Sequence, residues 1–283
     1  MAVDIDHLRG WIGRTETVHD TLTAAPLEAL AATLDRDVAA PRLGDAAPPG
    51  THWLYFLPAA RQSAIGPDGH PRRGGFLPPV PLPRRMWAGS QIAFQRPLAV
   101  GQALARCSRI EAVTMKEGRS GPLVFVKVRH ELLAERRPAL TEYQDIVYRD
   151  LPRPGDPAPA GVPAPPGASW TRRIDPDSVL LFRYSALTFN GHRIHYDRPY
   201  VTEVEGYPGL VVHGPLIATL LLDLLLRALP QAQVARFEFR AVQPLFDTAP
   251  FEVCGRTEDD GRVRLWAQTI DGLLAMDALA TLA

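Results

Sequence analysis

The chain has 283 residues, 46% of them hydrophobic, and its 31 Lys and Arg residues equal its 31 Asp and Glu residues, so the formal net charge is zero. This length allows one large domain or two moderate ones with real cores, and the absence of a net field argues against nucleic acid or an anionic membrane as a partner. Two cysteines exclude a disulfide framework or a cysteine metal cluster, and the N-terminal residues lack a signal-peptide pattern, so a cytoplasmic location is expected.

A helix is predicted within residues 11–35. Thr23 stands near its start, and apolar residues follow at helical spacing at Leu27, Leu30, Ala31 and Leu34. Residues 36–85 are expected to form loops, because the prolines of the segment 78–83 stand too close together for a buried helix.

Strands are predicted from Met86 to Arg149, where residues rich in Val, Ile and aromatic side chains occupy 91–94, 103–113, 123–133 and 139–148. Residues 118–121, Gly-Arg-Ser-Gly, look like a hairpin turn between two of them. The Pro-rich segment 151–168 can form no core, so we expect an extended linker between a domain of residues 1–150 and one of residues 169–283.

The second domain is predicted to begin with a helix that starts at Asp175 as N-cap and Pro176 at the first helical position. Its core face is expected to carry Val179, Phe182, Ala186 and Phe189. Asn190 and Gly191 end this helix, and a short irregular segment then carries His192, His195 and Asp197, where a turn can point side chains into a cleft.

A second helix is predicted after Gly214 and Pro215, with an apolar run from Leu216 to Leu229. Because the run is apolar on nearly every side, other structure must enclose it. It is shorter than the ~20 residues that span a bilayer, so it is interpreted as a core helix. Strands are expected again from Val234 to the end.

An internal repeat relates the two halves at a separation of 147 positions. The matched pairs are Pro97 and Pro244, Leu98 and Leu245, Cys107 and Cys254, Arg109 and Arg256, and Glu111 and Glu258. We therefore expect two copies of one helix-then-sheet unit, with the chemistry in the second copy and a partner sheet and more open cavity in the first.

This α+β organisation, a helix wrapped by antiparallel strands and repeated in tandem, resembles a double hotdog fold. Residues 187–197 resemble the hydratase motif of the MaoC-like family, and residues 209–214 resemble its oxyanion-hole segment. The chain is most similar to the two-domain branch with mesaconyl-CoA and itaconyl-CoA hydratases and the fungal mitochondrial 3-hydroxyacyl-thioester dehydratase. Asn190 stands where the family has a carboxylic acid.

The resemblance implies an acyl-CoA hydratase or dehydratase that adds water reversibly to an α,β-unsaturated thioester. His195 can act as base and acid, Asn190 can orient the water, and the Gly214 amide can stabilise the oxyanion. The substrate-binding residues implied by the resemblance are Tyr184, Ser185, His192, Arg193 and Val212.

Other interpretations stay open at this point. His192, His195 and His213 are a possible metal-binding set, although we expect neither a metal nor a redox cofactor, with CoA entering only as part of the substrate. His213 is expected to point away from the site. A hotdog thioesterase and a non-catalytic acyl-CoA-binding protein are the alternative functions.

Short dicarboxylic enoyl-CoA esters are the substrates that the resemblance favours. Their free carboxylate calls for a cationic partner, and the candidates are Arg61, Arg72, Arg73 and Arg84. A homodimer is expected, because sheet edges and faces remain to be covered.

Overall fold

One antiparallel sheet forms the body of the protein. The structure is a computed structural model that describes residues 3–118, 121–151 and 160–283. The strands are β1 (Thr15–Thr21), β2 (Arg84–Phe94), β3 (Ala103–Gly118), β4 (Gly121–Ala134), β5 (Arg137–Arg149), β6 (Trp170–Ile174), β7 (Val234–Ala241), β8 (Phe251–Thr257), β9 (Val263–Thr269) and β10 (Leu274–Leu282). The predicted strands are thus confirmed, whereas β1, most of β2 and β6 were not foreseen.

The strand order of the sheet is symmetric about its centre, β1-β3-β4-β5-β2-β7-β10-β9-β8-β6. Each half pairs its first strand with its third, and the halves join where β2 pairs with β7. The repeated cysteines occupy matching places, since Cys107 accepts a weak hydrogen bond from Thr17 of β1 and Cys254 accepts one from Thr171 of β6. This symmetry supports the proposed duplication.

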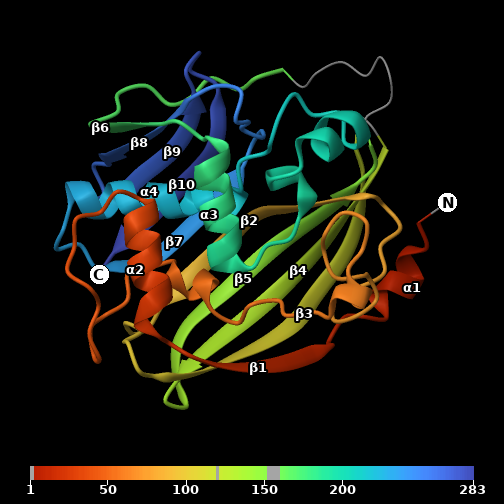
Figure 1. The fold of residues 1–283 in the computed structure, drawn as a ribbon, viewed down its shortest axis with the longest axis horizontal. Coiled ribbons are helices and arrows are strands. Elements are labelled where there is room, and N and C mark those ends of the chain that lie inside the picture. The colour runs from red at the N-terminus through yellow and green to blue at the C-terminus, as the bar shows by residue number, and fades with distance from the viewer. Residues whose placement is uncertain (1–2, 119–120, 152–159) are drawn as a thin grey trace.

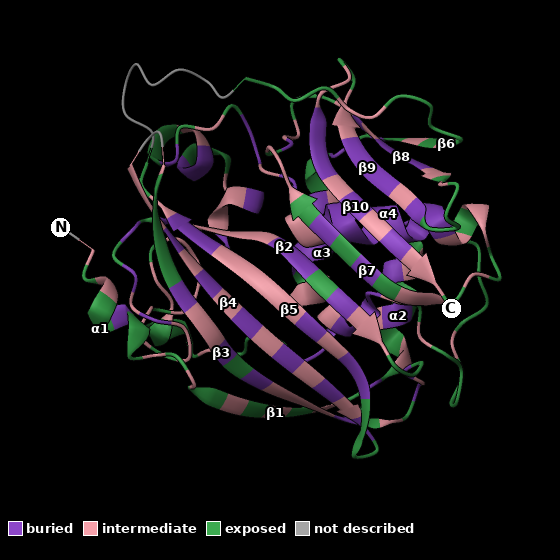
Figure 2. Ribbon diagram, turned by 180° about the vertical axis from the view of Figure 1, so that it is seen from behind, coloured by how far each residue is buried: buried purple, intermediate pink, exposed green. Residues whose placement is uncertain are grey.

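Helices cover one face of the sheet and leave the other face bare, as the two opposite views show (Figures 1 and 2). They are α1 (Ile5–Arg9), α2 (Ala24–Thr33), α3 (Ser178–Thr188) and α4 (Gly214–Ala228). Helices α2 and α3 lie side by side, and both follow the edge strand of their own half (Figure 1). The first half has no counterpart of α4 among its described residues.

Helix α4 is the buried centre of the second half. Every residue from Leu216 to Leu225 is buried, and the helix packs against β8, β9 and β10. Pro215 occupies the first turn, and the predicted core helix is confirmed. No helix among the described residues is long and apolar enough to cross a membrane.

Helix α3 differs from its prediction in both start and orientation. Asp177, not Asp175, is the N-cap, and its side chain accepts a hydrogen bond from the Leu180 amide at 2.8 Å. The predicted core residues Val179, Phe182, Ala186 and Phe189 are exposed, while Leu181, Tyr184 and Ser185 are buried. The prediction followed apolar spacing, but the face with Tyr184 and Ser185 packs inward because their polar groups find partners on α4 and at its N-terminus.

The long connection between α2 and β2 contains only short 3-10 turns, at Thr51–Leu54 and Gln62–Ala64, as the prolines indicated. One part of it lies against the second half. Gly69 has φ +88°, and a Cβ there would lie 1.8 Å from the Gly191 carbonyl oxygen, so only glycine allows this approach. The predicted hairpin turn at residues 119–120 and residues 152–159 of the expected linker lie outside the described residues; Gly118 pairs with Gly121.

Candidate active site

A cavity of about 1710 Å³ lies between the two halves, lined by the second half and by the long connection of the first. Seven of the eight residues predicted for the site line it: Tyr184, Ser185, Asn190, His192, His195, Val212 and Gly214. Arg193 is the exception. The tertiary structure therefore brings the predicted catalytic and substrate-binding residues together around one space.

His195 is held in a fixed orientation by the chain that leads into α4. Its Nδ1 donates to the carbonyl oxygen of Val211 at 2.7 Å, and the Val211 amide donates to the carbonyl oxygen of Ile194 at 2.9 Å. Because Nδ1 carries the proton of this bond, Nε2 has a free lone pair. The imidazole is thus set up to accept a proton at Nε2.

Burial determines the charge of His195. It lowers the pKa of this imidazole to about 4, although the hydrogen bond to the Val211 carbonyl acts in the opposite direction. The side chain is therefore neutral at pH 7, which is the form a general base requires.

His213 stacks on His195, with ring centroids 3.6 Å apart, but does not itself line the cavity. It is fully buried, and its Nε2 shares a hydrogen bond with the hydroxyl of Ser185 at 2.8 Å. The Tyr184 ring packs edge-on against it, and the Tyr184 hydroxyl lies 3.4 Å from Thr219 of α4. Tyr184 and Ser185 therefore hold His213 against the candidate catalytic imidazole of His195 as well as lining the cavity.

The N-terminus of α4 opens onto the same cavity at Gly214 and Pro215. The first amides of a helix lack intrahelical partners and carry the positive end of its dipole. The Val212 amide is already used, because it donates to Leu245 at 2.9 Å. Proline has no N–H, so Gly214 is the residue of this pair that can offer an amide to an oxyanion.

Asn190 terminates α3 and shapes the turn that follows. Phe189 adopts a left-handed conformation at φ 48°, which ends the helix. The Asn190 Oδ1 then accepts a hydrogen bond from the His192 amide at 3.0 Å. Among the described residues, the Asn190 amide nitrogen makes no hydrogen bond, so it remains able to orient water as predicted.

Arg193 and Asp197 fasten this turn rather than face the cavity. The Arg193 guanidinium pairs with Asp197 at 2.7 Å and donates to the carbonyl of Pro67, and its backbone amide donates to the carbonyl of Asp68. The Asp197 carboxylate also accepts from the Tyr200 amide. Arg193 thus joins the two halves of the protein, while its predicted contact with substrate stays untested.

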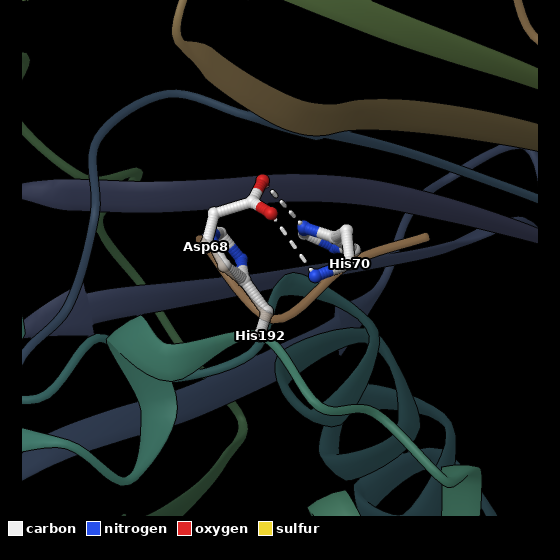
Figure 3. A group of neighbouring side chains, drawn as sticks. All are labelled: Asp68, His70 and His192. Atoms are coloured by element: carbon white, nitrogen blue, oxygen red, sulfur yellow. Dashed lines mark hydrogen bonds and ion pairs between the residues drawn. The ribbon is translucent and has the colours of Figure 1, made fainter. Parts of the chain in front are cut away.

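Asp68 and His70 of the first half reach the predicted site, which the sequence did not indicate. The His70 ring lies 4.1 Å from that of His192, and its Nδ1 lies 3.2 Å from the Asp68 carboxylate (Figure 3). Burial lowers the pKa of both imidazoles. The only local signal was the turn pattern Gly66-Pro-Asp-Gly-His70, which does not reveal its distant neighbour.

Asp68, His70 and His192 form a possible set of metal ligands. It differs from the set that the sequence suggested, which was His192, His195 and His213. The ligand atoms of the first set lie within 4.8 Å of one another, whereas His195 and His213 are engaged with Val211 and Ser185. The charge of Arg85 acts on Asp68, His70 and His192 and lowers the pKa of each. The Asp68 carboxylate is ionised, since its pKa is lowered to about 2, so this cluster contains an anion as well as the nearby Arg85 cation.

A second polar cluster surrounds Glu142 in the first half. Its fully buried carboxylate accepts hydrogen bonds from Ser90 at 2.7 Å and Trp53 at 3.2 Å and lies 3.1 Å from the His52 ring. Burial alone would raise the pKa of Glu142, but these contacts lower it to about 2. The carboxylate is thus ionised, and its satisfied bonds indicate a structural role.

The arrangement contains the groups that water addition to an activated alkene requires. His195 offers a neutral imidazole and Gly214 offers a helix-tip amide that makes no hydrogen bond to another described residue, and both line the same cavity. The fold and site together define a double-hotdog hydratase or dehydratase of acyl thioesters.

Comparison with known proteins identifies the family. The family described as hydroxyacyl-thioester dehydratase type 2 matches residues 50–247. Mesaconyl-C(4)-CoA hydratase of Chloroflexus aurantiacus is 50% identical over 275 residues, covering 96% of each chain. The mitochondrial hydroxyacyl-thioester dehydratase type 2 of Schizosaccharomyces pombe is 27% identical, covering 83% of this chain and 88% of its own.

Solved structures show the same fold. A MaoC-like dehydratase from Phytophthora capsici superposes with a TM-score of 0.72 at 15% identity, over 99% of this chain and 98% of its own. A Mycobacterium tuberculosis protein described as having a double hotdog fold gives a TM-score of 0.59 at 17% identity, with 96% of both chains covered. The chain belongs to the hydroxyacyl-thioester dehydratase type 2 family and is a hydro-lyase of acyl thioesters.

Proposed function

We propose that this protein hydrates a short dicarboxylic enoyl-CoA thioester reversibly, with mesaconyl-C4-CoA as the first substrate to test and itaconyl-CoA as a second. The observation that carries the proposal is that His195 and Gly214 line one cavity, with the Nδ1 of His195 bonded so that Nε2 is free to accept a proton. The 50% identity to a mesaconyl-C(4)-CoA hydratase supports the choice of substrate.

In the proposed reaction, Nε2 of His195 takes a proton from water while the water oxygen bonds to the β-carbon of the alkene. The electron pair of the double bond moves through the α-carbon to the thioester oxygen, where the Gly214 amide and the α4 dipole stabilise the negative charge. The imidazolium then returns the proton to the α-carbon. Asn190 orients the attacking water, and no oxidant or further cofactor takes part in this scheme.

The test is a screen of the purified protein with mesaconyl-C4-CoA, itaconyl-CoA and crotonyl-CoA. Formation of a hydroxyacyl-CoA from a dicarboxylic ester supports the proposal. Release of free CoA would instead establish a thioesterase, and binding without turnover would establish an acyl-CoA-binding protein.

His195→Ala tests the catalytic assignment within that screen. Loss of the base is expected to lower kcat by about 10²-fold or more, since general acid–base catalysis contributes roughly that much. His19→Ala, at a site on the edge strand β1 outside the cavity lining, is the matched control. A folded His195→Ala variant with nearly full activity would refute the assignment.

The homodimer and the cytoplasmic location expected from the sequence are retained as part of this proposal. The bare face of the sheet supports association with a second copy. Light scattering coupled to size-exclusion chromatography measures the mass directly, and a monomer at assay concentration would contradict the dimer.

A further inference from the structure

Six arginines line the cavity, and their partners separate them into two groups. They are Arg72, Arg73, Arg84, Arg85, Arg106 and Arg149. A substrate with a free carboxylate needs a cation whose donors are not already used by the protein. The ion pairs and hydrogen bonds of the described residues show which of the six meets that condition.

Two of the arginines named from the sequence are committed to structural bonds. Arg84 is buried, pairs with Glu205 at 3.0 Å and also donates to the Glu205 carbonyl. Arg73 donates to the carbonyls of Val80, Leu82 and Pro83. Neither guanidinium can turn to a ligand without losing these contacts.

The remaining lining arginines are less suited, apart from one. Arg72 is exposed, and Arg61, the fourth residue named from the sequence, is exposed and does not line the cavity. Arg149 donates to Tyr207, and Arg106 lies over the Phe56 ring with acidic neighbours that include Glu142. Arg85 and Arg106 are both partly buried and form no ion pair with another described residue. The charges of three carboxylates act on Arg106, from Glu16, Asp20 and Glu142, whereas Arg85 has Asp68 and the Tyr148 hydroxyl as neighbours. Arg85 is therefore the less neutralised of the two.

Arg85 also lies on the side of the cavity where the chemistry occurs. Its charge acts on His192 and His70, lowering the pKa of both, and His192 lies next to His195 with ring centroids 5.5 Å apart. Arg85 stands at the start of β2, opposite Tyr148 of β5, so the sheet fixes its backbone. Arg85 thus lines the same cavity as the predicted base and lies near the His70 and His192 pair, on a strand of the first half.

The shape of the proposed substrate places its carboxylate in this region. In a mesaconyl-C4-type thioester, the free carboxylate is bonded to the same carbon that receives the hydroxyl group. Its cationic partner must therefore lie close to the general base, and the neutral imidazoles there cannot supply the charge.

We propose that Arg85 binds the free carboxylate of the substrate and so selects dicarboxylic over simple enoyl thioesters. This inference rests on the proposed function for its substrate class. The guanidinium donates two N–H groups to the two carboxylate oxygens, which aligns the β-carbon as well as binding the charge. Arg85 is thus a specificity-determining residue supplied by the first half to chemistry in the second.

The test measures direct binding of a matched pair of saturated ligands by calorimetry. Succinyl-CoA and butyryl-CoA differ only in a carboxylate in place of a methyl group, and neither can be hydrated. Wild type is expected to bind succinyl-CoA more tightly than butyryl-CoA. The Arg85→Gln substitution is expected to lower the affinity for succinyl-CoA by about 10- to 100-fold, the range for loss of a charged hydrogen-bond partner. Binding of butyryl-CoA is expected to change by less than about twofold.

Two further variants make the result decisive. Arg85→Lys keeps the positive charge but lacks the planar, two-donor guanidinium, so its affinity for succinyl-CoA is expected to lie between those of wild type and Arg85→Gln. This variant also tests the inference if Arg85→Gln does not fold. Arg61→Gln removes an exposed arginine from the connection that precedes β2, outside the cavity lining, and is expected to bind both ligands like wild type.

The inference is overturned if wild type binds succinyl-CoA no more tightly than butyryl-CoA, or if Arg85→Gln lowers the affinity for both ligands by the same factor. It is also overturned if Arg61→Gln lowers the affinity for succinyl-CoA as much as Arg85→Gln does. Failure of the proposed function gives a different result, because a protein that hydrates none of the enoyl thioesters can still show the binding preference and its loss at Arg85.

Discussion

The environment of a single imidazole determines when this site can work. His195 gives its Nδ1 proton to Val211 and is stacked on His213, so its Nε2 is the group left for proton transfer. Burial holds the pKa of His195 at about 4, well below that of a free imidazole. The His195 imidazole is therefore uncharged throughout the neutral pH range, but it is a weaker base than a free imidazole.

This shift predicts the acid limb of the pH profile. With crotonyl-CoA, which has no carboxylate to titrate, kcat/KM is expected to stay level from about pH 8 to pH 6 and to fall as the pH approaches the His195 pKa of about 4. The reason is that activity needs the deprotonated form, which is lost only below that pKa. A limb centred near pH 6.5 would show instead that the base titrates like a free imidazole.

At the scale of the secondary-structure elements, the tip of α4 combines folding and chemistry. The apolar run makes the helix the core of the second half, and its N-terminus therefore meets the cavity at Gly214, whose amide has no intrahelical partner. Gly214 is not required by backbone strain or crowding, since a Cβ there would meet the Trp87 carbonyl oxygen at an ordinary 3.7 Å. Its role is access for a ligand.

Gly214→Ala is accordingly expected to lower activity without lowering stability. The midpoint of thermal unfolding should change little, because a methyl group fits. The same methyl group beside the amide should displace the thioester oxygen and lower kcat/KM by roughly tenfold to a hundredfold. Unfolding curves and steady-state kinetics measure the two effects, and a large loss of stability with normal turnover of the folded fraction would contradict this role.

The middle of α4 is tied to its surroundings by one charged residue. Asp223 is buried and pairs with Arg36, Arg172 and Arg227, which join α4 to β6 and to the chain that follows α2. It is therefore a buried, hydrogen-bonded residue of the core.

Asp223→Asn keeps the shape of this side chain and removes its charge. The free energy of unfolding is expected to fall by roughly 2–3 kcal/mol, somewhat less than for a fully buried pair because the three arginines are partly exposed and regain water. Asp260→Asn, at an exposed pair with Arg262, is the control and should leave the urea midpoint unchanged. Equal changes in the urea midpoint for the two substitutions would contradict the structural role of Asp223.

At the scale of the whole molecule, the cavity exists because the two halves are unequal. Helix α4 fills the concave side of the second half, while a loop replaces it in the first. That loop carries Asp68 and His70 to the turn with His192 and is fastened there by Arg193. The second half thus places the candidate base, His195, on the cavity, and the first half supplies the opposite wall with His70 and several arginines.

Buried neutral histidines should make the stability of the whole protein depend on pH. The pKa values of His195 and His130 are both lowered to about 4 by burial. The unfolded chain, with imidazole pKa values near 6.5, binds more protons than the folded one between those values, so stability falls on acidification. Glu142 and Asp68, with pKa values of about 2, remain ionised in both states above pH 5.

Each of these two imidazoles is expected to cost about 2 kcal/mol of unfolding free energy between pH 7 and pH 5. Urea unfolding at intermediate pH values measures the slope, and His130→Gln should remove one imidazole's share of it. Stability that stays constant or rises toward pH 5 would contradict the burial of neutral imidazoles.

Local pattern was sufficient for the elements whose signal lies within a few residues. The apolar run predicts α4 and the β-branched runs predict most of the sheet. His195 and Gly214, which were predicted for the site from the residues around them, line one cavity. The matching halves were also visible, because duplicated strands preserve residues at a constant separation. Each of these features depends on neighbours along the chain, which the sequence displays directly.

Only the tertiary structure decided the face of α3, the hydrogen-bond partner of His195 and the contribution of the first half. Spacing favoured Phe182 as a core residue, yet Tyr184 and Ser185 pack inward because α4 and His213 offer polar partners there. Arg85, His70 and His192 are far apart in sequence, and their proximity arises from a sheet joined at β2 and β7 and a loop held by Gly69. Such contacts depend on how separate elements pack, which periodicity along one chain does not encode.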